Sequence, residues 1–333
     1  MRGVVIAAAL LLGIGVPAAG IALLVPSLES SSKALVTNYR GRKVFYGLGV
    51  AWLLWAGSAM IAGVAPELIA GRSVIRILLL AGPLALVAFA LGAVDDAYGT
   101  ADARGFKGHI KALLAGRLTT GGMKLFGLSL ASLIVALVIE ELAPWGTVTA
   151  AGLPGAFTKL GLGLLAGASI ALTSNFVNLT DLRPGRALKV YSVLAVFGVL
   201  STALLFGANA RAFDTSLASR VIDVAALLLF ALGPVIAVWR YDLGERGMLG
   251  DAGANPMGAV AGLLIVAGLP LWALAVYFVV IFGLNLASEK VSFSKVIAAS
   301  RLLSRIDDIG RLPQDELSSE INETCPPTDT NPE

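Results

Sequence analysis

Residues 74–96 read VIRILLLAGPLALVAFALGAVDD, an apolar run that ends abruptly in two adjacent carboxylates, Asp95 and Asp96. The run is long enough for one membrane helix, which needs about 20 apolar residues. Two acids at the exit of such a helix are costly unless a cation neutralises them. The loop that follows, up to Lys124, is basic and rich in glycine. The acid pair therefore marks either a plain boundary that ends a membrane helix, or a site for a divalent cation and phosphate.

The composition indicates a membrane protein. Of the 333 residues, 57% are hydrophobic and 14% are charged, with a mean hydropathy of +0.83, whereas a soluble domain carries roughly 25% charged residues. We therefore expect an all-α, polytopic membrane helix bundle. The net charge of +3 is too small to indicate a nucleic-acid partner. One cysteine, Cys325, excludes an internal disulfide, and one histidine, His109, excludes a metal site of several histidines within one chain.

Apolar runs of suitable length predict about nine membrane helices. The first run follows Arg2 but exceeds the roughly 7–15 apolar residues of a signal peptide, so we expect a helix that is retained. The last run is too long for one upright helix and contains Pro270, so it predicts two helices that turn near this proline. The predicted ranges are 3–25, 46–65, 74–94, 125–142, 160–177, 190–208, 221–239 and, for two helices together, 257–286.

Basic residues are distributed unequally between the two ends of the predicted helices. The loops on the Asp95 side, together with the segment after residue 286, hold nineteen Lys and Arg, against five on the opposite side. Cytoplasmic loops of membrane proteins carry such an excess. The bias predicts a multi-pass protein of the plasma membrane with its active-site loops on the cytoplasmic face. The N-terminus is then outside and, with nine helices, the C-terminus is inside.

The chain divides into one large domain and two short C-terminal segments. Residues 1–290 form the expected transmembrane domain. Residues 291–312 mix apolar and charged side chains at helical spacing, which predicts an amphipathic helix that either lies on the inner membrane surface or packs in the cytoplasm. Residues 313–333 are rich in Pro, Asp, Glu and Thr, and we expect a disordered acidic tail.

Two further loops on the Asp95 side carry polar residues that a connector does not need. Asn175, Asn178 and Asp181 lie three apart, so at a helix end they share one face and can bind a nucleotide or a metal ion. Asp251 lies in a glycine-rich turn directly before a helix, whose exposed N–H groups can face an anion. Each pattern alone is equally consistent with helix capping, hydrogen bonding between helices or a simple turn.

In this order and on one membrane face, the patterns resemble the polyprenyl-phosphate N-acetylhexosamine-1-phosphate transferases. That superfamily includes phospho-N-acetylmuramoyl-pentapeptide transferase, and the resemblance covers about residues 1–290. The residues that carry it are the acid pair Asp95-Asp96, Lys111 in the next loop, Asn175, Asn178 and Asp181, Gly250-Asp251 with Gly253 and, less specifically, the segment Asn38-Tyr39-Arg40-Gly41-Arg42-Lys43.

The resemblance implies a transferase of cell-envelope glycan synthesis. An oxygen of polyprenyl phosphate attacks the sugar-linked phosphorus of a UDP-sugar, and UMP leaves, while Mg²⁺ neutralises the pyrophosphate. By motif match, Asp95, Asp96 and Asp251 are the expected catalytic residues. Asp251 and one acid of the pair, taken as Asp96, are the expected metal ligands. The expected substrate ligands are Lys111 on a phosphate, Asn178 and Asp181 on the nucleotide side, and Asn175.

The chain departs from the family on the side of the sugar donor. Arg183 and Arg186 lie where the family has small or apolar residues. They can either bind a phosphate or carboxylate with paired hydrogen bonds, or bind lipid headgroups and so anchor the loop at the membrane. The histidine cluster that many relatives carry in the last cytoplasmic loop is absent from the sequence. We therefore include both arginines among the substrate ligands and expect a donor other than UDP-N-acetylmuramoyl-pentapeptide.

Two other functions fit parts of the pattern. A non-catalytic relative would bind polyprenyl phosphate or a lipid-linked sugar without releasing UMP. A transporter would bind a coupling ion with its carboxylates, but these acids lie at one membrane face rather than at mid-depth. The expected partners are thus polyprenyl phosphate, a UDP-sugar and the lipid bilayer, while monomer and homodimer both stay open.

Overall fold

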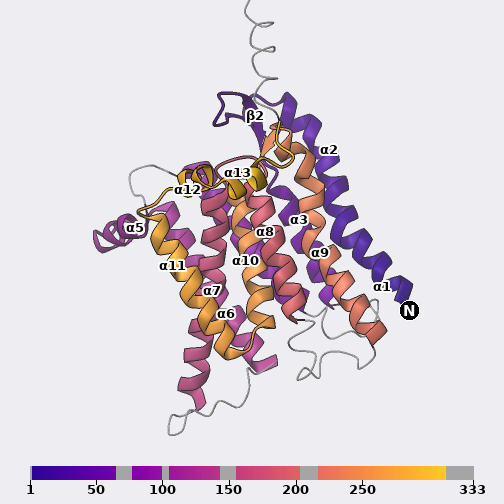
Figure 1. Ribbon diagram of the computed structural model, residues 1–333, viewed down its shortest axis with the longest axis vertical. Coiled ribbons are helices and arrows are strands. Elements are labelled where there is room, and N and C mark those ends of the chain that lie inside the picture. Colours follow the sequence, from indigo (N-terminus) through magenta and orange to yellow (C-terminus); the bar gives the residue numbers. More distant parts are fainter. Residues whose placement is uncertain (1, 65–76, 100–104, 143–154, 203–216, 313–333) are drawn as a thin grey trace, which may run out of the picture.

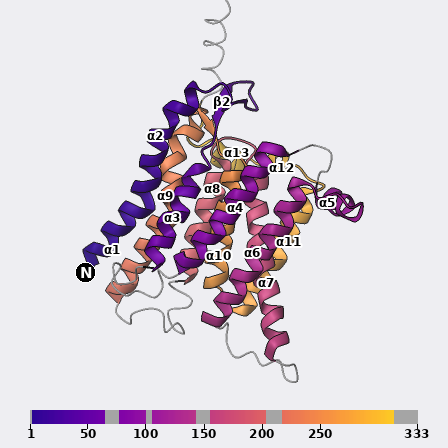
Figure 2. The ribbon, with the colours of Figure 1, turned by 180° about the vertical axis from the view of Figure 1, so that it is seen from behind.

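The structure is a computed structural model of the chain that describes residues 2–64, 77–99, 105–142, 155–202 and 217–312. The predicted tail, 313–333, lies outside the described residues. The described part is an all-α bundle of long helices that run side by side (Figures 1 and 2). The helices are α1 (Arg2–Ala8), η1 (Ala9–Gly15), α2 (Val16–Ser30), α3 (Val50–Val64), α4 (Leu78–Tyr98), α5 (Gly105–Leu114), α6 (Thr120–Leu142), α7 (Gly155–Thr180), α8 (Arg186–Leu200), α9 (Leu217–Leu243), α10 (Asp251–Gly268), α11 (Leu271–Ser288), α12 (Phe293–Ala299) and α13 (Arg301–Asp308).

Six helices within the described residues are long and apolar enough to cross a membrane, so the chain is a multi-pass membrane protein. They cover Gly3–Ser30, Leu78–Tyr98, Thr120–Ile139, Gly155–Thr180, Arg220–Leu243 and Leu271–Ser288. Each of the eight predicted ranges overlaps a described helix, although residues 65, 74–76 and 203–208 of these ranges lie outside the described residues. The last range holds two helices, α10 and α11, which turn at Pro270 as expected. Because α3, α8 and α10 are not among the six, the count of nine spans stays a prediction.

Helix α10 forms the centre of the bundle. It packs against α4, α7 and α8, and all of its residues except Asp251 and Ala267 are buried. The close approach to α7 depends on glycine, because a Cβ at Gly258 would collide with the backbone of Ser174. Small residues let helix backbones pack closely in this way inside a membrane. The first residue of this central helix is Asp251, which fixes where that carboxylate can lie.

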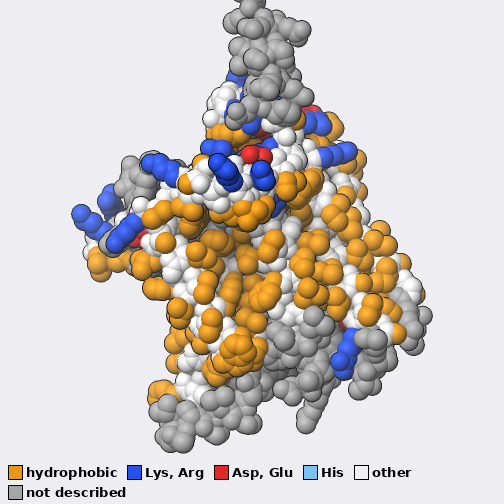
Figure 3. Space-filling model, viewed as in Figure 1, with side chains coloured by type: hydrophobic (Ala, Val, Ile, Leu, Met, Phe, Trp, Pro, Cys, Tyr) orange, Lys and Arg blue, Asp and Glu red, His pale blue; other side chains and the backbone are white. Residues whose placement is uncertain are grey.

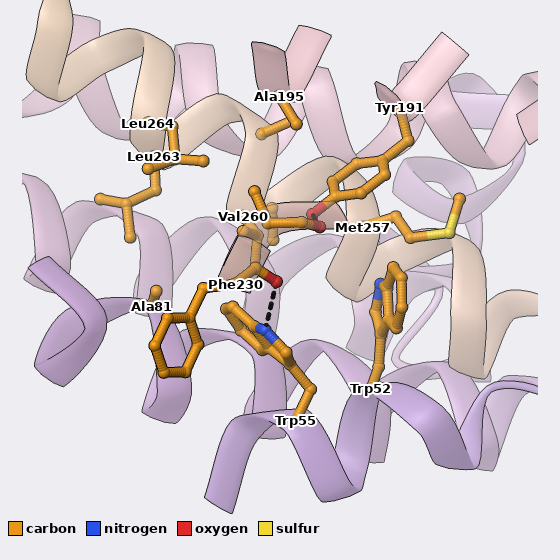
Figure 4. Close-up of a cluster of buried hydrophobic side chains, with 14 of the residues drawn as sticks. Trp52, Trp55, Ala81, Tyr191, Ala195, Phe230, Met257, Val260, Leu263 and Leu264 are labelled. Atoms are coloured by element: carbon orange, nitrogen blue, oxygen red, sulfur yellow. Dashed lines mark hydrogen bonds between the residues drawn. The ribbon is translucent and has the colours of Figure 1, made fainter. Parts of the chain in front are cut away.

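A cluster of aromatic side chains fastens α3 to α8 and α9 (Figure 4). The indole N–H of Trp55 donates to the Phe230 carbonyl oxygen at 2.7 Å, and the Tyr191 hydroxyl donates to the Ala231 carbonyl oxygen at 2.7 Å. The rings of Trp52 and Tyr191 lie 5.6 Å apart. Buried Trp and Tyr are tolerated where their polar atoms find such partners.

A small three-stranded sheet lies at the end of the bundle next to α2 (Figure 1), and the predicted all-α class did not include it. Strands β1 (Leu35–Thr37) and β2 (Lys43–Tyr46) form an antiparallel hairpin, and β2 pairs in parallel with β3 (Gly247–Met248). The hairpin turn forms because the Asn38 side-chain oxygen accepts hydrogen bonds from the N–H groups of Arg40 and Arg42. The sheet thereby joins the first loop to the segment just before α10.

The C-terminal amphipathic segment contains two helices, α12 and α13, where the sequence predicted one. The chain is extended at Ser300, whose hydroxyl accepts from the N–H of Leu303 and caps α13. Both helices cross the end of the bundle, where Lys and Arg side chains gather above a broad apolar flank (Figures 1 and 3). The large exposed apolar side chains of the segment are Val291, Val296, Leu302, Leu303, Ile306 and Ile309.

Candidate functional site

The predicted acid pair lies in the last turn of α4, beside the start of α10. The two helices approach because Gly92 has no side chain, and a Cβ there would collide with the Asp251 carbonyl oxygen. The Asp96 carboxylate accepts hydrogen bonds from the backbone N–H groups of Asp251 (3.0 Å) and Ala252 (2.8 Å). A helix start leaves such N–H groups without partners inside the helix. Asp96 therefore caps α10 from a different helix, 155 positions away in sequence.

Tyr46, the last residue of β2, also contacts Asp96. Its hydroxyl donates a hydrogen bond to the Asp96 carboxylate. Burial, together with this hydrogen bond and the negative charge of Asp96, raises the pKa of Tyr46 above its usual value. The phenol therefore stays protonated at neutral pH and holds Asp96 in place as a donor.

Asp95 and Asp251 converge on one ammonium group, that of Lys124 in α6. The Lys124 Nζ lies 2.8 Å from Asp95 Oδ2 and also donates to Asp251 Oδ2. On its other oxygen, Asp251 accepts a hydrogen bond of 2.6 Å from the Asn178 amide of α7. The side chains of Asp95, Asp251 and Lys124 retain 18–24% of their exposure, so solvent and small ligands can reach them. We call Asp95, Asp96, Asp251, Asn178 and Lys124 the acid–lysine cluster.

Asp181 lies next to this cluster, directly after α7. It accepts a hydrogen bond from the backbone N–H of Gly250. Burial raises the pKa of Asp181 well above its usual range, and the negative charges of Asp242, Asp251 and Asp96 raise it further. Asp242, at the end of α9, is buried and accepts from the Gly185 N–H at 2.6 Å, which fixes the turn after Asp181. The neighbourhood of the cluster is thus rich in carboxylates.

The structure separates the other predicted ligands from the acid–lysine cluster. Lys111 is exposed on α5, which projects from the side of the bundle (Figures 1 and 2). The Asn175 amide donates to the Asn285 side-chain oxygen of α11 at 2.7 Å. The guanidinium of Arg183 lies 5.5 Å from the ring centre of Tyr39. Of the predicted site residues, Asp96, Asp251 and Asn178 are hydrogen-bonded directly. Asp95 is joined to Asp251 through Lys124, and Asp181 lies beside them.

Arg186 points away from the cluster, toward the C-terminal segment. It is buried, and its guanidinium binds both oxygens of Asp307 in α13 at 2.9 and 2.8 Å. Arg311 binds the same carboxylate with two bonds of 2.8 Å. The Arg186 side chain is therefore engaged in a buried ion pair rather than free to bind a donor phosphate.

Lys124 and Tyr46 are the cluster contacts that sequence reasoning missed. Lys124 carries one available signal, a positive charge near the start of an apolar helix on the Asp95 side. That signal cannot tell which acid the lysine will meet, since 29 positions separate it from Asp95 and 127 from Asp251. Tyr46 has no signal beyond its place before a glycine-rich turn.

The position where the Asp95 and Asp251 carboxylates converge suits a divalent cation. The Lys124 ammonium occupies a position where the Asp95 and Asp251 carboxylates converge, and Mg²⁺ favours one or two carboxylates completed by substrate phosphates and water. Asp95 and Asp251 would hold the ion, whereas Asp96, the predicted ligand, has both oxygens engaged by backbone N–H groups. No group of three or more His, Cys, Asp or Glu side chains within the described ranges is arranged to hold a metal by itself.

Comparisons with known proteins add no relative. No family model matches the chain, and a search of curated proteins finds no match.

Proposed function

We propose that the chain is an integral membrane phosphoglycosyl transferase that moves a sugar-1-phosphate from a UDP-sugar to polyprenyl phosphate and releases UMP. One observation carries the proposal. Asp95, Asp251 and Asn178, predicted from three separate motifs, meet at one end of a bundle of apolar helices. A carboxylate cluster at the end of membrane helices, open to solvent, suits a reaction between a soluble nucleotide sugar and a lipid phosphate.

The proposed reaction exchanges one phosphoanhydride bond for another. An oxygen of the lipid phosphate forms a bond to the sugar-linked phosphorus, and the bond from that phosphorus to the UMP oxygen breaks. Bound Mg²⁺ would supply charge neutralisation for the pyrophosphate. Asp95 and Asp251 would hold the ion, Asn178 orients Asp251, and Asp96 keeps the start of α10 in register with α4. By motif match Asp181, which lies beside the cluster, would contact the nucleotide.

The experiment that tests the proposal measures UMP release. Purified protein is incubated with undecaprenyl phosphate, Mg²⁺ and each of a set of UDP-sugars, and UMP is quantified by chromatography. We expect UMP release that depends on both the lipid and Mg²⁺, with a donor other than UDP-N-acetylmuramoyl-pentapeptide. Robust turnover of UDP-N-acetylmuramoyl-pentapeptide would show that the missing histidine cluster does not exclude this donor.

A second candidate is a non-catalytic relative that binds polyprenyl phosphate or a lipid-linked sugar. The observation that favours it is the Lys124 ammonium, which already bridges the two carboxylates that would hold the metal. Lipid binding without UMP release from any UDP-sugar would establish this candidate and reject the transferase.

The orientation of the site follows from the charge distribution. We propose that the end with the acid–lysine cluster, α5, α12 and α13 faces the cytoplasm, since it holds most of the Lys and Arg residues (Figure 3). A reporter fused after Arg311 is then expected to be active only in its cytoplasmic form. A fusion after Ser30, at the same end of the bundle, is the matched reference and should give the same result. An extracytoplasmic signal from the Arg311 fusion would reverse the assignment.

A further inference from the structure

Lys124 is not among the residues on which the motif resemblance was based. Its ammonium group lies between Asp95 and Asp251, hydrogen-bonded to both, and it comes from α6. The side chain is 18% exposed, and its ammonium lies at the end of a flexible chain of four carbons. The ammonium can therefore withdraw without any movement of the helix.

The charges around the ammonium are not balanced by it. Asp95, Asp96 and Asp251 bring three carboxylates close together, because Lys124 bridges Asp95 and Asp251 and the backbone N–H of Asp251 donates to Asp96. Asp181 lies close enough to Asp96 and Asp251 for their charges to affect its ionisation. Within the described residues, the contacts of Asp95 and Asp251 include one cationic group, that of Lys124. A divalent ion would add a second positive charge at the same place, and phosphates bring further oxygen ligands to it.

We propose that Lys124 is an internal cation that competes with the divalent metal ion for Asp95 and Asp251. The ammonium offsets part of the negative charge of the two carboxylates while the metal is absent, and metal binding requires it to withdraw. The displaced ammonium then lies beside the metal, where the phosphate of a substrate can accept its hydrogen bonds. This inference depends on the proposed function for the identity of the cation, but the competition itself is a property of the protein alone.

The test measures metal binding rather than turnover. Mn²⁺, a spectroscopic substitute for Mg²⁺, is titrated into the purified full-length protein, and free Mn²⁺ is followed by electron paramagnetic resonance. Lys124→Met is expected to bind Mn²⁺ about tenfold more tightly than the wild type, because charge-assisted hydrogen bonds to the ammonium no longer compete. Lys124→Arg keeps the competing charge and should show no such gain. Lys290→Met removes an exposed lysine elsewhere and should bind as the wild type does.

Thermal unfolding provides a second measurement if Lys124→Met folds less well. Without its ammonium, the variant should unfold at a lower temperature than the wild type in EDTA. It should also gain more than the wild type when Mg²⁺ is added, since the ion replaces the lost charge. Equal or weaker Mn²⁺ binding by Lys124→Met, with no larger gain from Mg²⁺, would overturn the proposal. Because neither readout needs a UDP-sugar, failure of the transferase assay and failure of the competition are distinguishable.

Discussion

Replacing Asp251 by Asn is expected to reduce Mg²⁺-dependent UMP release by at least about 100-fold, because even groups that only orient a metal ligand contribute 10–100-fold. Asp251 is the carboxylate on which Asn178 and Lys124 both converge, and its oxygens face the proposed metal position. The substitution keeps the size of the side chain and removes its charge. Initial rates of UMP release from the wild type and the variant, in the same detergent and lipid, provide the measurement.

Asp308→Asn is the matched control for this substitution. The Asp308 side chain is 67% exposed in α13, so the same chemical change there should leave the rate unchanged. The backbone N–H of Asp251 still binds Asp96 after the substitution, so the thermal unfolding midpoint of Asp251→Asn should stay close to that of the wild type. A variant that folds normally and turns over at the wild-type rate would contradict the assignment of Asp251 to the site.

Asp307→Ala is expected to cost about 3–5 kcal/mol of the free energy of unfolding, the typical effect of removing one partner from a buried ion pair. The Asp307 carboxylate is shared by two buried guanidiniums, those of Arg186 and Arg311. Without it Arg186 loses its counter-charge, and Arg311 keeps, among the described acids, only the longer contact of 3.7 Å with Asp308. Denaturant titration of the protein in detergent micelles measures the loss.

The control for Asp307→Ala is an ion pair of the same chemistry on the surface. Glu29 and Arg246 bind at 2.7 Å, but both side chains are largely exposed, so Glu29→Ala should cost at most about 1 kcal/mol. A loss of similar size in the two variants would show that the buried pair does not fasten the C-terminal segment.

The same carboxylate should make the wild type sensitive to acid. Burial alone would raise the pKa of Asp307, but the hydrogen bond from Arg186 and the charge of Arg311 outweigh it and lower the pKa below its usual value. The folded pKa is thus below the unfolded value of about 3.9. The contribution of the pair is present above about pH 4 and is lost as the pH falls below it. Asp307→Ala should lack this acid-dependent part of the stability.

Much of the fold follows from residue patterns that act locally. Uninterrupted apolar runs predict helices because a membrane offers backbone groups no other partner. Pro270 separates α10 from α11 because it disfavours a helical backbone at the residue before it, and Leu269 and Pro270 are both extended. The strands β2 and β3 lacked such a signal, since each is only two to four residues long and their pairing joins Phe45 to Gly247 across most of the chain.

The acids of the site were predictable and their partners were not. Asp95, Asp96 and Asp251 are conspicuous because a carboxylate at the end of an apolar helix needs compensation. Which group provides it depends on how helices pack, and no spacing links Lys124 to these acids. The same limit applies to Arg186, where the sequence suggested a donor ligand and the packing of α13 gives it a buried carboxylate instead.

The central place of α10 has a consequence for how the protein is made. The helix is rich in Gly and Ala and contains the buried Asn255, and it is not among the six helices apolar enough to partition into lipid by composition. Its neighbours α4, α7 and α8 all precede it in the chain, so the surface that buries it is synthesised first. We therefore expect insertion of α10 during translation to depend on contact with helices already in the membrane, so that Asp251 reaches Asp96 only in a late step.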